Sequence, residues 1–274
     1  MASKTKVAPK KGSDGKKKEL VPSGGNLPAS LAGRMAKDSG KGVSTRQEDN
    51  LVPMITILQK MSPQCEKKDP KYMDGADAGV IWLKGADDPL VSGEDGIVVQ
   101  PCHFDGPDWV EWKPNRGGFV ARHPTRPSDA SEMVDAKTKK KSWVRKNGNE
   151  VVETRYHTVR VFKEDGTKPA YVIPLSSTGH TVSKDWMFRM NNTALPSGEK
   201  APSFACLWKL STRYRENDSG NWYQFQVERV GWVESVEDYE QGLSLFTAFD
   251  KGEKKADMSQ MADEASASDS SGRM

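Results

Sequence analysis

The clearest pattern in the chain is the alternation of apolar and polar positions in its second half. Between Tyr156 and Phe162 successive side chains belong to opposite faces of an extended segment, as in a strand that is buried on one side. Short runs of Asp, Asn, Ser and Gly interrupt the alternation where a tight turn is needed. The pattern therefore predicts two antiparallel hairpins, 151–163 with 170–175 and 203–215 with 221–232.

Apolar residues at helical spacing predict three helices, at 50–62, 183–191 and 236–249. In the first, apolar positions recur every three or four residues and stop at Pro63, which cannot continue a helix. Ser183 is a suitable N-cap for the second.

The stretch before the first long hairpin contains two shorter β segments. Residues 97–103 and 108–112 flank the turn-forming residues Asp105, Gly106 and Pro107, so they also form an expected hairpin. Residues 113–146 are then rich in Pro, Gly and Lys, which predicts a long, basic, mobile loop.

This order of elements favours a mainly β fold with flanking helices. A helix inserted before the last pair of strands fits a small, partly open Greek-key barrel, so we expect an OB-like antiparallel barrel of five or six strands. A β-sandwich is the alternative architecture. The chain has no internal repeat and no βαβ alternation, which argues against Rossmann and TIM-barrel folds.

Composition separates a central domain from two tails. Residues 1–46 carry 11 Lys and Arg against 3 Asp and Glu, and residues 250–274 carry 4 against 6; neither tail contains an aromatic residue. Such segments bury too little apolar surface to offset their ordering entropy, so we expect a disordered basic arm, a single domain at 47–249 and a disordered, mildly acidic tail. The basic arm is equally consistent with phosphate contacts and with a solubilising role.

The chemical motifs of common enzymes are absent from the sequence. It has no Gly-rich nucleotide loop, no HExxH and no GxSxG, and its four His residues are isolated from one another. The three Cys residues lie far apart, which argues for reduced thiols. We therefore expect no enzymatic activity, no metal and no cofactor. No apolar run is long enough for a membrane span and no secretory signal is present, so we expect a cytosolic protein.

Binding signals are stronger, because aromatic and basic residues are interleaved on the predicted strands. Aromatic rings stack on bases while cations contact phosphates, which is how proteins bind single-stranded nucleic acid. The alternative interpretation is that these aromatics fill the core. The candidate nucleic-acid-binding residues are Tyr156, Lys209, Arg213, Tyr214, Arg215, Trp222 and Tyr223, with Lys139, Lys140 and Lys141 of the basic loop as an outer clamp.

Several stretches resemble a family of tailed-bacteriophage proteins that are often encoded with replication genes. The resemblance covers roughly residues 48–248, and its stretches are Leu51–Gln64, Tyr72–Gly79, Val98–Cys102, Val110–Pro114, Gly117–Val120 and Asn221–Tyr223. Some members look like single-stranded DNA-binding proteins. The chain departs from many such binders in ending Gly-Arg-Met rather than in an acidic, aromatic tip.

The resemblance implies a protein that coats single-stranded DNA during phage replication or recombination in the host cytoplasm. Its implied partners are single-stranded DNA and replication or recombination proteins, with no membrane involved. The alternatives are a virion structural or assembly protein, and a regulator that occupies the surface of a host enzyme.

Overall fold

A computed structural model describes residues 29–38, 42, 51–114, 117–134, 141–218 and 220–263. The chain divides into two units, Met1–Thr45 and Arg46–Met274. Within the first, the structure describes helix α1 (Ala29–Lys37). Most of the predicted basic arm 1–46 lies outside the described residues, apart from α1, Asp38 and Gly42. Of the predicted acidic tail 250–274, residues 250–263 are described, and they contain a short strand, Lys255–Ala256, and a 3-10 segment, Met258–Asp263.

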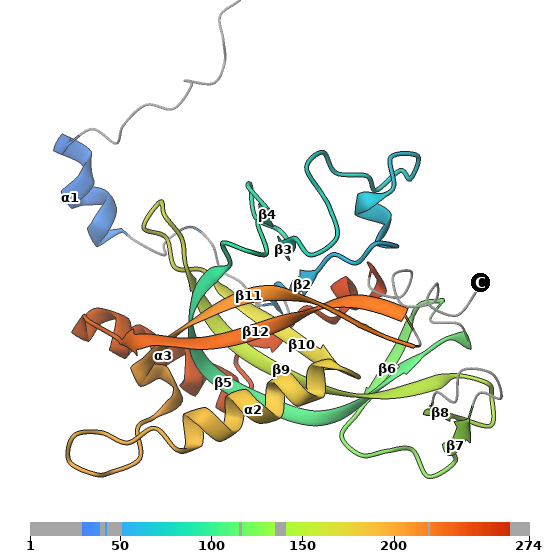
Figure 1. The fold of residues 1–274 in the computed structure, drawn as a ribbon. Coiled ribbons are helices and arrows are strands. Elements are labelled where there is room, and N and C mark those ends of the chain that lie inside the picture. The colour runs from blue at the N-terminus through green and yellow to red at the C-terminus, as the bar shows by residue number, and fades with distance from the viewer. Residues whose placement is uncertain are drawn as a thin grey trace, which may run out of the picture. The chain divides into compact units, whose positions relative to one another are not determined.

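Five long strands form the main sheet of the second unit (Figure 1): β5 (Ile97–Trp112), β9 (Glu150–Phe162), β10 (Ala170–Ser176), β11 (Cys206–Asn217) and β12 (Gly220–Trp232). The strands pair in the order β12-β11-β5-β9, and β10 also pairs with β9. The neighbours β9–β10 and β11–β12 are antiparallel, which confirms the two long hairpins predicted from the alternation.

Strand β5 corrects the prediction of a short hairpin at 97–112. It is one continuous strand that pairs with β9 along its length, from Val98 opposite Phe162 to Trp112 opposite Glu150. The register shifts between Pro101 and His103 and again between Asp105 and Asp108. These irregularities accommodate the turn-forming residues as β-bulges, so the strand bends without reversing.

The predicted basic loop at 113–146 contains three strands. They are β6 (Phe119–His123), which pairs with β5, and the hairpin of β7 (Ser131–Val134) with β8 (Lys141–Val144), which pairs with β9. All three gather at one end of the main sheet (Figure 1). We call residues 113–149 the excursion. Its strands form because β5 and β9 extend far enough to offer hydrogen-bonding edges to β6 and β8.

The predicted helix at 50–62 is wrong. Its place is taken by β1 (Leu51–Val52), β2 (Ile55–Ile57) and the 3-10 turn Pro63–Cys65. Strand β1 pairs in parallel with β13 (Lys255–Ala256), and β2 begins the small sheet β2-β3-β4 with β3 (Ile81–Leu83) and β4 (Leu90–Val91). Consecutive residues Met54, Ile55 and Thr56 are all buried, so this β-branched segment is enclosed on two sides, whereas an amphipathic helix buries one.

Two of the predicted helices are confirmed as α2 (Gly179–Asn191) and α3 (Val236–Asp250). The predicted N-cap of α2 is wrong, because the helix already begins at Gly179 and Ser183 is a buried residue inside it. Ser235 caps α3, because its side chain accepts a hydrogen bond from the backbone amide of Asp238. Helix α2 packs against β10 and β12. In the described residues no strand pairing joins β10 to β12, so the sheet is open rather than a closed barrel.

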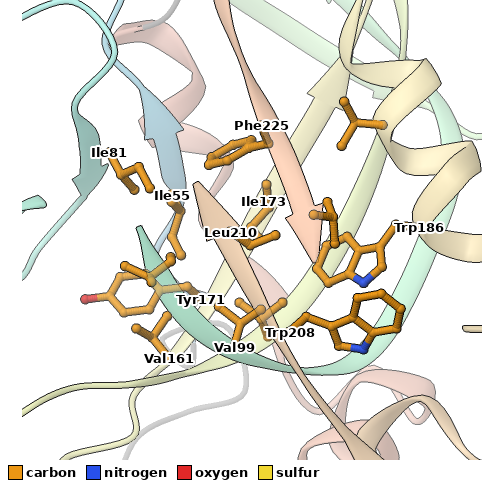
Figure 2. Close-up of a cluster of buried hydrophobic side chains, with 14 of the residues drawn as sticks. Ile55, Ile81, Val99, Val161, Tyr171, Ile173, Trp186, Trp208, Leu210 and Phe225 are labelled. Atoms are coloured by element: carbon orange, nitrogen blue, oxygen red, sulfur yellow. The ribbon is translucent and has the colours of Figure 1, made fainter. Parts of the chain in front are cut away.

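The main core fills the concave side of this open sheet (Figure 2). Trp186 of α2 and Trp208 of β11 meet edge to face, with ring centroids 6.2 Å apart, at one end of the cluster. Ile55 and Ile81 of the small sheet lie at its other end. The cluster therefore joins both sheets and α2 into one hydrophobic unit.

The opposite face of β9 is covered as well. Arg160 of β9 is 8% exposed and donates to the side chain of Asp238 in α3, which also receives two hydrogen bonds of 2.8 Å from Lys168. Further along the same face, Tyr156 packs in a second cluster with Met261 of the 3-10 segment Met258–Asp263. Both faces of the central part of β9 are thus buried by the chain itself.

Candidate nucleic-acid interface

The register of the β11–β12 hairpin divides the candidate residues between two faces. Directly opposite residues of an antiparallel pair project to the same side. Arg215 lies opposite Trp222, and Tyr214 lies opposite Tyr223. Because Arg215 and Tyr214 are neighbours in the chain, the two pairs belong to opposite faces of the hairpin.

The first face is cationic and polar. Arg213 lies opposite Gln224 on this face, and Lys209 lies opposite Glu228 further from the turn. Arg213 is exposed, and Arg215 and Trp222 are half-buried. The indole Nε1 of Trp222 donates to Gln224 Oε1 at 3.3 Å, which orients the ring beside the arginines. We call Arg213, Arg215 and Trp222 the hairpin face.

An open hollow of about 600 Å³ lies between the hairpin face and α2. It is lined by Thr181, Val182, Asp185, Arg189, Arg213, Arg215, Gln224, Phe225, Gln226, Val227 and Glu228. Sequence reasoning did not include Arg189, whose Nε lies 2.9 Å from Asp185 and whose Nη1 donates to the Val227 carbonyl at 3.4 Å. The spacing of Asp185 and Arg189 on a predicted helix signals an ion pair, but only the fold shows that it borders the hairpin.

The second face carries the two tyrosines. Their rings meet edge to face at 5.5 Å. Tyr223 is half-buried, and a Cβ at Gly79 would come within 2.6 Å of its ring, so the ring lies close against that backbone. Tyr214 is 47% exposed, and its hydroxyl donates to Glu216 Oε2 at 3.0 Å, which raises the pKa of Tyr214. Tyr214 is therefore accessible, on the side away from the arginines.

Tyr156 is not at any surface. Its side chain is 2% exposed, and the guanidinium of Arg122 lies 4.6 Å from its ring centroid. A base has no face of this ring on which to stack, which removes Tyr156 from the candidate site. The alternation of β9 placed it opposite the core, but the chain around residues 256–261 covers that side.

The basic-loop lysines are only partly described. Lys139 and Lys140 lie outside the described residues. Lys141 begins β8, is exposed, and forms an ion pair of 2.7 Å with Glu132 of β7. It belongs to the excursion and not to the hairpin face.

Two buried titratable groups, His157 and Cys102, are held in their neutral forms. His157 is 1% exposed; burial and, secondarily, the charge of Arg155 lower its pKa to about 3, and its Nε2 lies 2.8 Å from Ser183 Oγ. Burial also raises the pKa of Cys102 to about 12. Within the described part of the chain, no three His, Cys, Asp or Glu side chains gather as a metal ion would require.

These features define a mainly β protein with an open antiparallel sheet and a cationic hairpin face. The chain belongs to the Pam3 phage gp34-like protein family, whose family pattern matches residues 21–255, and it is therefore a bacteriophage protein. No curated protein and no solved structure matches it. None of the helices that the structure describes is long and apolar enough to cross a membrane.

Proposed function

We propose that this phage protein binds single-stranded DNA without enzymatic activity and coats it during replication or recombination in the host cytoplasm, alongside other proteins of those processes. The observation that carries the proposal is the register of the hairpin, which puts Arg213 and Arg215 on the same accessible face as Trp222. Stacking on an aromatic ring contributes about 1 to 3 kcal/mol per base, and neighbouring cations contact the phosphates.

The strand connections support this proposal. In chain order, β5, β9 and β10 are followed by α2 and then by β11 and β12, and β5 pairs with both β9 and β11. We take this as the arrangement of an OB-like barrel left open between its third and fifth strands. In such folds the loops after the first and fourth strands bind oligonucleotides. Here those loops are the excursion 113–149 and the turn of the β11–β12 hairpin.

Coverage of β9 limits where DNA can bind. Arg160 and Tyr156 on the outer face of β9 are buried under α3 and the following segment, so a strand cannot lie across that face. The proposed contact therefore uses the hairpin face, including Arg189 of the adjoining hollow.

The proposal is tested by titrating the full chain with a thymidine oligonucleotide and with a duplex, at two salt concentrations, while following tryptophan fluorescence. The expected result is quenching by the single strand that weakens with salt, and a double variant Arg213→Ala/Arg215→Ala that binds less tightly. Its salt slope should fall by about 0.7 for each lost phosphate contact.

The matched control is Lys67→Ala/Lys68→Ala, which removes the same charge from exposed positions that are not part of the hairpin. If both double variants lost the same affinity for the single strand, the effect would follow from net charge alone, and this would contradict the assigned face. The absence of single-strand binding by the unmodified chain at low salt would contradict the function itself.

A virion structural or assembly role is the second candidate, and one observation favours it. An apolar stripe on α3 is exposed, and it consists of Val236, Tyr239, Leu243 and Phe246. Exposed apolar stripes of this kind serve protein contacts. Sedimentation of the protein with purified particles, resistant to nuclease, would support this role over strand coating.

A further inference from the structure

A second aromatic and cationic group, apart from the hairpin, lies where the excursion packs beside β5. The indole of Trp109, in β5, meets the indole of Trp143, in β8, edge to face with centroids 6.0 Å apart. The guanidinium of Arg126 lies 3.7 Å from the Trp143 centroid and 5.6 Å from that of Trp109. Arg126 is exposed and both indoles are half-buried. We call these three residues the indole pair site.

Strand pairing places the two indoles on one face of the sheet. Trp109 pairs with Glu153 and Trp143 pairs with Val151, two residues apart on β9. Because residues separated by two on a strand share a face, the two rings project to the same side across β9. Both indoles are therefore positioned by paired strands and not by a loop.

A buried carboxylate fixes the same region. Glu111 lies two residues from Trp109 on the same face, and its side chain is 3% exposed. It accepts hydrogen bonds from Asn149 at 2.6 Å, from Arg145 at 2.7 Å and from Asn147 at 3.5 Å, and His123 Nε2 lies 2.8 Å from it. Arg145 is two residues from Trp143, so Glu111 ties both indole-bearing strands together.

The acidic groups around the site are engaged by cations. Arg145 also donates to both oxygens of Asp129, at 3.0 and 3.2 Å, and Arg155 donates to Glu153 at 3.1 Å. Exposed Lys146 follows β8 and adds a further cation close to Arg145 in the chain. A phosphate chain next to the site thus meets cations rather than unpaired carboxylates.

We propose that the indole pair site is a second contact for single-stranded DNA, at which an unpaired base stacks on the Arg126–Trp143 pair with Trp109 as a side wall. A guanidinium that lies flat on an indole offers a planar cation to a base and donors to its phosphate. A duplex is excluded because its bases are already stacked. This inference rests on the proposed function and extends it to the loop after the first barrel strand.

The test combines cross-linking with binding. A thymidine oligonucleotide carrying 5-iodouracil is irradiated with the full chain, and the linked residues are mapped by mass spectrometry. Cross-links at Trp143 or Trp109 are expected in addition to any at the hairpin face. In parallel, Trp143→Ala and Arg126→Ala are each expected to weaken binding about tenfold, and Arg126→Ala should disturb the fold less.

Arg229→Ala is the matched control, because Arg229 is an exposed arginine that lies 4.5 Å from the ring centroid of Trp232, outside the site. It is expected to bind like the unmodified chain. Arg126→Ala still tests the site if Trp143→Ala misfolds, because it removes only an exposed side chain.

The inference would be overturned if Arg126→Ala and Trp143→Ala kept their affinity and the oligonucleotide cross-linked to no residue in the range 109–143. The proposal for the hairpin face would still stand. A lack of single-strand binding by the unmodified chain would overturn the proposed function as well. Binding that is lost in Arg213→Ala/Arg215→Ala and reduced about tenfold in Arg126→Ala would support both sites.

Discussion

The side-chain amide of Gln59 makes both hydrogen bonds of a strand partner with the backbone of Tyr223. Its Nε2 donates to the Tyr223 carbonyl at 2.9 Å, and its Oε1 accepts from the Tyr223 amide at 2.9 Å. One amide thus satisfies the outer edge of β12 at the point where a closed barrel would have another strand. Arg189 does the same for the Val227 carbonyl. These contacts protect an edge that otherwise invites pairing with another chain.

Replacing Gln59 tests this edge contact. Gln59→Glu removes the donor and sets a carboxylate against the Tyr223 carbonyl, so we expect a loss of about 2 kcal/mol in the free energy of unfolding at pH 7, against about 1 kcal/mol for Gln59→Ala. Urea unfolding measures both. Below the pKa of the new carboxyl, its proton can be donated to the Tyr223 carbonyl, so the difference in unfolding free energy between Gln59→Glu and Gln59→Ala should become smaller. A difference that does not change with pH would contradict the contact.

Glu111 should make the excursion sensitive to acid. Burial would raise the pKa of Glu111, but hydrogen bonds from Asn149, His123, Arg145 and Asn147 outweigh it and lower the pKa to about 2. The resulting stabilisation, about 3 kcal/mol, is complete above the unfolded-state pKa near 4.5 and is lost as pH falls towards 2. Glu111→Gln should therefore be markedly less stable at pH 7, with a difference that shrinks below pH 4.5.

The control for this carboxylate is Glu94→Gln, at an exposed position. It should unfold at nearly the same urea concentration as the unmodified chain throughout the pH range. If Glu111→Gln behaved like this control at pH 7, the four hydrogen bonds would not hold the excursion in place.

His157 should make the stability of the fold depend on pH in a less acidic range than Glu111 does. Its pKa is lowered from 6.5 to about 3, so the unfolded chain binds a proton that the folded chain does not between these values. Stability therefore falls as pH drops below 6.5, by about 1.4 kcal/mol per pH unit. His157→Gln loses the ring stacked on Trp186 but should show a shallower fall between pH 6.5 and 4.5.

Some slope should remain in that variant, because burial also lowers the pKa of His103. The measurement is urea unfolding at half-unit steps of pH. Identical slopes for the variant and the unmodified chain would show that His157 is protonated in the folded state.

Gly242 allows α3 to approach β5 closely. A Cβ at this position would lie 2.5 Å from Gln100 Nε2 and 3.0 Å from the Cβ of Phe204. Gln100 cannot withdraw easily, because it is fully buried and donates to the carbonyls of Phe204 and Asp238. Gly242→Ala should thus lose about 1 to 2 kcal/mol by overpacking, despite the better helix propensity of Ala.

Ser244→Ala is the matched control, at an exposed position of the same helix. Propensity alone should make it more stable, by about 0.5 kcal/mol. A gain in stability in both variants would mean that α3 does not pack tightly on Gln100.

The two long hairpins and the helices α2 and α3 were predictable because their signals are local. In the β11–β12 hairpin, alternation and a turn rich in Asn, Asp, Ser and Gly specify both the strands and their reversal. Ser235 followed by Asp238 marks the start of α3 in the same way. The segment at 51–58 was not predictable, because apolar positions at helical spacing also fit a strand buried on two sides.

The candidate site was predictable to the extent that it depends on one hairpin. Arg213, Arg215 and Trp222 follow from alternation along neighbouring strands, whereas Tyr156 was misassigned because its cover comes from residues 100 positions later. The indole pair site was out of reach for the same reason. Trp109 and Trp143 are 34 residues apart in the chain and meet only because β5 and β8 both pair with β9.

The parallel pair β1–β13 brings the two ends of the second unit together. The amide of Asp257 donates to the Val52 carbonyl at 2.9 Å, and the Met54 amide donates to Gln260 Oε1 at 2.8 Å. A circularly permuted chain should therefore keep the fold if a short Gly-Ser linker joins Asp263 to Leu51 and the new ends open at the exposed turn Asp165–Gly166. Such a permutant would close both natural ends of the unit and offer new ends at the β9–β10 turn for fusion to other domains.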